Sequence, residues 1–241
     1  MTEEEILTIK SNIANIRSRM DLATQKAGRD PKDITLLAAT KMNSAERVQA
    51  AIRCGIRCCG ENKVQELLDK YELNAYEGAD LQFIGTLQTN KVKYLIGKVS
   101  LIQSVGSIHL GEVIAREAAK RNTVQDILIE VNIGLEEAKS GILPQELFSC
   151  IEELSALSSL RIRGLMAIPP VADANTGNTA YFQQMQRLYE ELKSRDYPNV
   201  KADTLSMGMT DDFEDAIACG STMIRLGTAV FGRRNYGSAE V

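Results

Sequence analysis

Eight short apolar segments recur at near-regular intervals along this chain, and helical patterns separate them. The segments are typical of buried strands and cover Ile34–Thr40, Ile56–Gly60, Gln82–Gly85, Ser100–Ser104, Asp126–Asn132, Ile162–Ile168, Thr204–Met207 and Met223–Gly227. The spacing predicts helices over Ala45–Cys54, Lys63–Tyr71, Ile108–Lys120, Glu146–Leu157, Tyr181–Ser194 and Asp211–Cys219. Strands that alternate with helices pair in parallel, and eight is the number that closes a (β/α)8 barrel.

We therefore expect an α/β protein, a single (β/α)8 TIM-type barrel over residues 1–241 with an extra amphipathic N-terminal helix at about residues 3–27. An open doubly wound sheet is the competing interpretation. Because no GxGxxG follows the first strand, its dinucleotide-binding version has no support. No low-complexity linker divides the chain, and we expect the segment PPVADANTGN to be a surface loop.

The composition excludes several classes of partner. A net charge of -4 gives no electrostatic reason to expect nucleic acid or an anionic membrane. No apolar stretch reaches the roughly 18 to 20 residues of a membrane span, and the acidic start MTEEEI is unlike a signal peptide. We therefore expect a cytoplasmic protein.

The cysteines and the histidine predict neither a disulfide framework nor a metal site. The five cysteines are odd in number, with Cys54, Cys58 and Cys59 clustered and the other two far away. CxxxCC is not a zinc pattern, and His109 is far from the cysteines in sequence. We expect the cysteines to act as small buried hydrophobes and His109 to lie near a helix start.

Lys41 follows the first apolar run directly, and in a barrel the functional side chains gather where strands end. We expect apolar surroundings there, which favour the neutral amine that can attack an aldehyde. Lys41 is therefore a Schiff-base candidate, and the alternative is a solvated loop charge. The other strand ends, such as Gly60-Glu61-Asn62, are also polar or contain glycine.

The last two strand ends predict a phosphate site. Barrels often bind phosphate in the loops after strands seven and eight. Ser206 and Thr228 can supply hydroxyl donors, and Gly208 and Gly227 let the backbone approach an anion.

A capping role is the alternative for the loop SMGMT, with Thr210 as the N-cap of the next helix and Gly220 as its stop. The two roles are compatible. Asp211 and Asp212 would repel a phosphate unless they point away from it.

Arg225 lies within an apolar strand, MIRLGT, where an unpaired charge is costly to bury. Strand alternation puts it on the same side as Met223 and Gly227, facing the barrel mouth. The alternative is a structural ion pair with Glu61 or Glu130.

The stretches ATK, GENKVQE, FIGTLQTNK, EEAKSGI, RGLMAIP and LSMGMTDDFEDAIACGSTMIRLGTAVFG resemble the pyridoxal phosphate homeostasis proteins, a family similar to the N-terminal barrel domain of alanine racemase. The resemblance covers nearly the whole chain. It implies a barrel that holds pyridoxal 5′-phosphate at its C-terminal mouth. The site it implies has Lys41 as the aldimine lysine, Asn62 beside the cofactor, Ser206, Gly208, Gly227 and Thr228 at the phosphate, and Arg225 facing the pyridine nitrogen.

Two segments depart from the family pattern. The third-strand motif usually carries Trp-His before Phe and a proline after the glycine, whereas this chain has Leu81-Gln82 and Thr86. After strand four the family often shows Asp-Arg, and this chain has Gly106-Ser107. Interactions made through those loops are in doubt, whereas the cofactor residues are intact.

The same residues predict modest carbanion chemistry. A guanidinium at the pyridine nitrogen disfavours its protonation and so weakens the cofactor as an electron sink. The resembling racemases take their second acid/base, a tyrosine, from a C-terminal β domain of a partner subunit. This chain ends at Val241, shortly after its eighth strand, and none of its seven tyrosines lies at a strand end.

Three functions follow. The first is a non-catalytic pyridoxal phosphate protein in vitamin B6 homeostasis, which holds the cofactor on Lys41 and delivers it to apo-enzymes, as a monomer. The second is an enzyme with weak racemase-type activity on amino acids. The third is a phosphate-sugar barrel enzyme with Lys41 as an aldolase-like base. Lys139, in AKSGI, either helps exchange the cofactor or is a solvated loop lysine.

Overall fold

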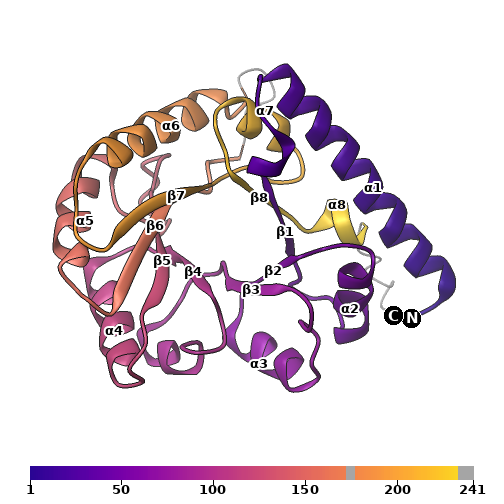
Figure 1. Ribbon diagram of the computed structural model, residues 1–241, viewed down its shortest axis with the longest axis horizontal. Coiled ribbons are helices and arrows are strands. Elements are labelled where there is room, and N and C mark those ends of the chain that lie inside the picture. The colour runs from indigo at the N-terminus through magenta and orange to yellow at the C-terminus, as the bar shows by residue number, and fades with distance from the viewer. Residues whose placement is uncertain (172–176, 233–241) are drawn as a thin grey trace.

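The computed structural model describes residues 1–171 and 177–232, which form a closed barrel of eight parallel strands in the order β1 to β8 (Figure 1). The strands are β1 (Thr35–Ala39), β2 (Cys58–Glu61), β3 (Asp80–Phe83), β4 (Leu101–Val105), β5 (Gln125–Glu130), β6 (Leu160–Met166), β7 (Val200–Ser206) and β8 (Met223–Leu226). β1 closes the barrel because Leu37 pairs with Cys58 on one side and with Arg225 on the other.

Helices surround the barrel (Figure 1). They are α1 (Glu3–Lys26), α2 (Ala45–Arg53), α3 (Val64–Glu72), α4 (Ile108–Ala119), α5 (Leu147–Ser155), α6 (Thr179–Ser194), α7 (Phe213–Ala218) and α8 (Thr228–Phe231), with short 3-10 turns η1 (Pro31–Asp33), η2 (Thr89–Tyr94) and η3 (Pro144–Glu146). The extra helix α1 begins with a capping box between Thr2 and Glu5. It packs along α2, α7 and α8.

The expected barrel and the expected N-terminal helix are confirmed. Several element bounds differ from the sequence expectation, among them those of β7 and α7. β7 begins at Val200 rather than Thr204, because Lys201 and Asp203 interrupt its first four residues, none of which is buried, and no continuous apolar run marks them. α7 begins at Phe213 with Asp212 at the N-cap, so the expected N-cap at Thr210 is wrong. The four-residue helix α8 was not expected and directly follows β8.

The barrel interior combines an apolar cluster with a polar layer. The apolar cluster contains Leu37, Ala39, Cys58, Ile84 and Met223. Four buried polar side chains from β3, β4, β7 and β8 also lie in the interior, namely Gln82, Gln103, Ser206 and Arg225. Buried polar groups need hydrogen-bond partners, so this layer constrains the geometry of the barrel mouth.

The five cysteines are free thiols, and all except Cys54 are buried. Burial raises the pKa of Cys59 to about 12 and that of Cys150 to about 11. The exposed His109 lies in the first turn of α4 with Nδ1 3.9 Å from Glu112. Four of the cysteines are thus small buried residues as expected, whereas Cys54 is only partly buried. His109 lies near a helix start, as expected.

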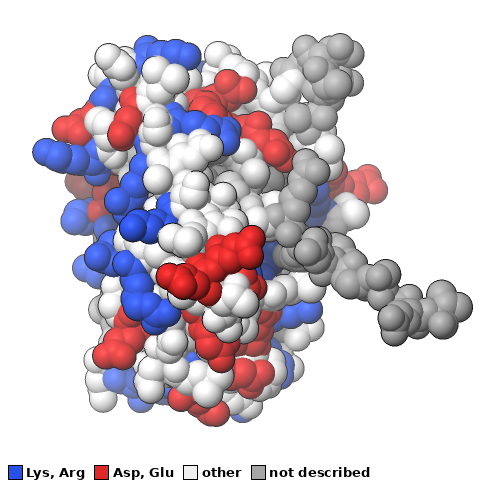
Figure 2. Space-filling model, turned by 90° about the vertical axis from the view of Figure 1, so that its right-hand side faces the viewer, with Lys and Arg blue, Asp and Glu red and all other residues white. Residues whose placement is uncertain are grey.

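The outer surface carries charge of both signs. Figure 2 shows the face formed by α1 and its neighbours, where basic side chains gather along one edge and acidic ones lie across the middle and lower parts. Among the described residues, no helix is both long and apolar enough to cross a membrane.

Candidate functional site

A cavity of about 250 Å³ lies at the C-terminal ends of β1, β7 and β8. Its lining consists of Ala39, Lys41, Asn43, Met209, Thr210, Asp211, Arg225, Gly227, Thr228, Phe231 and Gly232. Four of the seven predicted cofactor residues, Lys41, Arg225, Gly227 and Thr228, therefore share one cavity. The other three, Asn62, Ser206 and Gly208, lie at the ends of β2 and β7 and do not line it.

Lys41 lies in a turn immediately after β1 and is exposed at the rim of this cavity. The apolar surroundings expected for it are wrong, because burial ends at Thr40 and the chain then turns outward. The turn is closed by the Asn43 N–H, which donates to the Thr40 carbonyl at 3.1 Å. An exposed amine on a fixed turn is open to a ligand that enters the mouth.

The residues on both sides of Lys41 are held by a buried network behind the turn. The Thr40 hydroxyl donates to Glu61 Oε1 at 2.7 Å, and the Thr40 carbonyl accepts from Lys70 Nζ at 2.8 Å. The Met42 N–H donates to Glu66 Oε1, with Met42 at a φ of 59° in the left-handed region. The backbone of Lys41 is therefore fixed at both of its neighbours.

Lys70 is the centre of this network, and the sequence analysis missed it. Its Nζ lies 2.5 Å from Glu61 Oε1 and 2.7 Å from Glu66 Oε1. The hydroxyl of Tyr76 also donates to Glu61 Oε1, at 3.1 Å. In the sequence, Glu66 and Lys70 look like an ordinary i,i+4 pair on a helix surface. Only the packing of α3 against the barrel reveals that Lys70 is buried.

Arg225 is buried inside the barrel mouth and is held by neutral acceptors. Nη1 donates to Ser206 Oγ at 2.6 Å, and Nη2 donates to the Ala167 carbonyl at 2.9 Å. Among the described residues it forms no ion pair, so the alternative of a structural pair with Glu61 or Glu130 is wrong. Burial lowers the pKa of Arg225 to about 10, an effect that the charge of Glu130 partly opposes. The guanidinium therefore keeps its charge at neutral pH.

The ends of β7 and β8 show how the predicted phosphate residues lie. Ser206 is fully buried, and its hydroxyl donates to Gln103 Oε1 at 2.7 Å while accepting from Arg225. Gly208 has a φ of 94°, and its carbonyl accepts from the Arg225 N–H at 3.0 Å. Thr228 is exposed, and Gly227 precedes it on the same cavity wall. Ser206 and Gly208 thus accept hydrogen bonds from Arg225 and do not line the cavity.

The two aspartates after β7 have different surroundings. Asp212 accepts from the Met209 N–H and from Asn178 Nδ2, both at 2.7 Å. Its carboxylate is therefore occupied by the loop and by the start of α6. Asp211 is exposed and lines the cavity, so it is the acid that an anion would meet.

Asn62 follows β2, the strand beside β1, and its buried side-chain Oδ1 has no hydrogen-bond partner among residues 1–171 and 177–232. A buried acceptor without a partner costs free energy that a donor from a ligand would recover. A Cβ added at Gly85 would lie 2.0 Å from the Asn62 carbonyl oxygen. Glycine at position 85 thus allows the segment after β3 to approach Asn62 closely.

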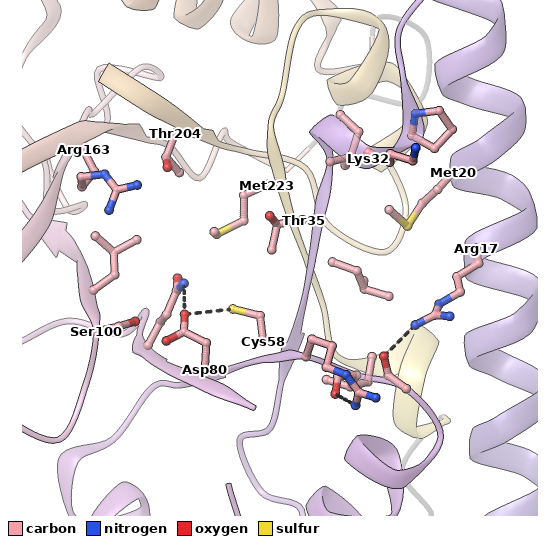
Figure 3. A pocket seen from close by; sticks show the side chains of 18 of the residues that line it. Arg17, Met20, Lys32, Thr35, Cys58, Asp80, Ser100, Arg163, Thr204 and Met223 are labelled. Carbon is pink, nitrogen blue, oxygen red and sulfur yellow. Dashed lines mark hydrogen bonds between the residues drawn. The ribbon is translucent and has the colours of Figure 1, made fainter. Parts of the chain in front are cut away.

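A larger cavity, of about 710 Å³, opens at the opposite end of the barrel, where the strands begin (Figure 3). Two carboxylates on its wall, Asp80 and Asp126, already have partners within the protein. Asp80 accepts from Cys58 Sγ at 3.8 Å and from Gln82, whereas Asp126 pairs with Arg161 and Arg163. The amine of Lys41, the guanidinium of Arg225 and the Asn62 oxygen lie at the C-terminal end of the barrel. We therefore take that end as the functional site.

The chain is a closed parallel barrel with a lysine after its first strand and an arginine in its last, and it belongs to the class of alanine racemase-type barrel domains. The family model described as "Alanine racemase, N-terminal domain" matches residues 9–235. An alanine racemase from Clostridium difficile shares the fold at a TM-score of 0.68 and 13% identity, covering 97% of this chain and 58% of that one.

Curated relatives narrow this class. The chain is 44% identical over 226 residues to the pyridoxal phosphate homeostasis protein of Aquifex aeolicus, covering 93% of this chain and 97% of the relative. The Escherichia coli K12 protein of that name is 38% identical, with coverages of 95% and 97%. The chain belongs to the pyridoxal phosphate homeostasis protein family.

Solved structures agree with this assignment. An unknown protein from Bifidobacterium adolescentis is 33% identical with a TM-score of 0.90, covering 95% of this chain and 97% of that one. PipY from Synechococcus elongatus, solved with PLP bound, is 30% identical with a TM-score of 0.80, covering 93% of this chain and all of that one.

The network behind Lys41 makes a stability prediction. Replacing Lys70 by methionine leaves the Glu61 carboxylate buried without its cation, so we expect the free energy of unfolding to fall by about 3–5 kcal/mol. Tyr76→Phe removes one hydrogen bond and should cost about 1–2 kcal/mol. The exposed Lys63 is the matched control, and Lys63→Met should change stability by less than about 0.5 kcal/mol. Urea unfolding followed by circular dichroism measures all three, and equal values for the two lysine variants would contradict the network.

Proposed function

We propose that this chain binds pyridoxal 5′-phosphate at the C-terminal mouth of its barrel and holds the aldehyde of the cofactor as an aldimine on Lys41. In this proposal it is a non-catalytic cytoplasmic protein of vitamin B6 homeostasis, a monomer formed by one barrel over residues 1–241, that delivers the cofactor to apo-enzymes. The observation that carries the proposal is that Lys41 and Arg225 line the same cavity. The names of its relatives and PLP-bound PipY support it.

The residues at the mouth fit such a cofactor. Lys41 provides an accessible primary amine, and imine formation joins its nitrogen to the aldehyde carbon while the aldehyde oxygen leaves as water. Thr228 provides a hydroxyl, and Gly227, which precedes it on the cavity wall, has no side chain to enter the cavity. Asn62 provides a buried oxygen that has no partner within the described part of the chain.

Arg225 favours holding the cofactor over carrying out chemistry with it. Strong electron-sink chemistry needs a protonated pyridine nitrogen, which a neighbouring cation disfavours. The lowered pKa of about 10 still leaves Arg225 charged at neutral pH. In the proposed pose, with Arg225 facing that nitrogen, the cofactor is a weak sink.

Weak racemase-type activity is the second candidate, because the family model is that of the alanine racemase barrel domain. Such activity needs an acid/base on the second face of the substrate. Tyr76 lies behind the Lys41 turn, but burial and the charge of Glu61 raise its pKa, so its phenol stays protonated. We expect single L-amino acids incubated with cofactor-loaded protein to keep their enantiomer ratio. Robust formation of D-enantiomer, measured by chiral chromatography, would replace the carrier proposal by an enzymatic one.

Lys41→Ala tests the cofactor proposal directly. We expect wild-type protein mixed with pyridoxal 5′-phosphate to show a visible absorption band, and borohydride reduction to fix one cofactor on the peptide that contains Lys41, as read by mass spectrometry. Lys41→Ala removes the amine and should abolish both signals. Lys63→Ala, which changes an exposed lysine two residues after β2, is the control that should retain both. A band that survives Lys41→Ala would contradict the proposal.

The phosphate residues can be separated by single variants. We propose that Gly227 and Thr228 contact the phosphate, with Ser206 and Gly208 completing that side of the site. Thr228→Val removes a hydroxyl on the cavity wall and should speed cofactor loss during dialysis about tenfold, the equivalent of one hydrogen bond. The hydroxyl of Ser206 is already bonded to Gln103 and Arg225, so Ser206→Ala should alter the absorption spectrum more than the rate of loss. The opposite ranking would place the phosphate at Ser206.

A further inference from the structure

A continuous chain of hydrogen bonds crosses the barrel interior between Arg225 and Asp80. Arg225 Nη1 donates to Ser206 Oγ at 2.6 Å, and Ser206 Oγ donates to Gln103 Oε1 at 2.7 Å. Gln103 Nε2 donates to Gln82 Oε1 at 2.6 Å, and Gln82 Nε2 donates to Asp80 Oδ2 at 2.8 Å. The chain thus joins β8, β7, β4 and β3 and connects the two ends of the barrel.

The chemistry of its two ends sets the direction of this chain. A guanidinium can only donate and an ionised carboxylate can only accept, so both amides and the hydroxyl must all point the same way. Each link therefore donates toward Asp80. Hydrogen bonds aligned in one direction polarise one another, most of all in an interior that screens charge poorly. The three linking side chains are each at most 5% exposed.

Asp80 is the negative end of this chain and the part of it that solvent reaches. It is the first residue of β3 and lies on the wall of the cavity of about 710 Å³, beside Cys58 (Figure 3). Arg225, at the other end, is buried and forms no ion pair among the described residues. The chain therefore links a buried cation to a carboxylate near the far end of the barrel.

We propose that Asp80 is a positioning residue for Arg225. Through the side chains of Gln82, Gln103 and Ser206, Asp80 orients the Arg225 guanidinium and offsets its positive charge at the mouth. This proposal rests on the proposed function, in which Arg225 faces the cofactor. It assigns a task to polar residues that do not line the cavity at the mouth. It also means that the charge state of the cavity at the N-terminal end acts on the cofactor site.

A second carboxylate in the same cavity provides a matched control. Asp126 also lines the cavity, but it pairs with Arg161 at 2.7 Å and with Arg163 at 2.6 Å. Replacing either aspartate by asparagine removes one negative charge from the same cavity. Of these two aspartates, Asp80 alone is joined to Arg225 by hydrogen bonds between described side chains, so its substitution should be felt at the mouth and that of Asp126 should not.

The test compares Asp80→Asn with Asp126→Asn in protein loaded with pyridoxal 5′-phosphate. Loss of the Asp80 charge leaves more positive potential at the mouth, which disfavours protonation of the bound cofactor. We expect the midpoint of the bound cofactor's spectroscopic pH titration to fall by about 0.5–1 pH unit, which corresponds to the free energy of one hydrogen bond. Asp126→Asn should leave it unchanged. Gln103→Met, which breaks the chain in the middle, should shift the titration in the same direction as Asp80→Asn.

A double-mutant cycle and a cofactor-free measurement complete the test. In an Arg225→Leu background, Asp80→Asn should produce no further shift, because the effect passes through Arg225. In cofactor-free protein, the NMR signals of the Arg225 guanidinium should change in Asp80→Asn and not in Asp126→Asn. Equal effects of the two aspartate variants, or a shift that persists without Arg225, would overturn the proposal. If wild-type protein binds no cofactor, the proposed function fails while the NMR comparison still decides whether the chain couples the two ends.

Discussion

Closure of the barrel is the constraint on which the rest of the structure depends. β1 hydrogen-bonds to β2 on one side and to β8 on the other, so the strand before Lys41 and the strand that holds Arg225 are neighbours although they are far apart in the chain. All eight strands run in the same direction, and their C-terminal ends therefore meet at one mouth. Lys41 and Thr228 lie far apart in the sequence, and they share a cavity because of that pairing.

The mouth contains two buried cations that the protein accommodates in different ways. Lys70 has two carboxylate partners, Glu61 and Glu66, and this network fixes the turn that carries Lys41. Arg225 has a hydroxyl and a carbonyl as its partners, and its pKa is lowered by burial. A buried charge without a carboxylate partner is costly, and such cost is commonly retained where a function uses the charge. The contrast supports a structural task for Lys70 and a chemical task for Arg225.

The polar layer inside the barrel links these arrangements to the far end of the molecule. Most barrels of this kind fill their interior with branched apolar side chains. Here Gln82 and Gln103 occupy interior positions, and each is satisfied by its neighbours in a single direction. A satisfied polar core restricts the rotamers of its members more strictly than apolar packing does. Arg225 is thereby held at one orientation before any ligand arrives.

The sequence by itself determined the barrel and its extra helix, because apolar runs and helical patterns are local and the rules of parallel pairing are general. It placed Lys41, Arg225, Gly227 and Thr228 at a common mouth, and the structure has them there. Tertiary structure alone decided that Lys41 is exposed, that Lys70 is buried, and that the Ser206 hydroxyl accepts a hydrogen bond from Arg225. Those facts depend on which strands and helices become neighbours, and burial and hydrogen-bond partners are set by contacts between residues distant in the chain.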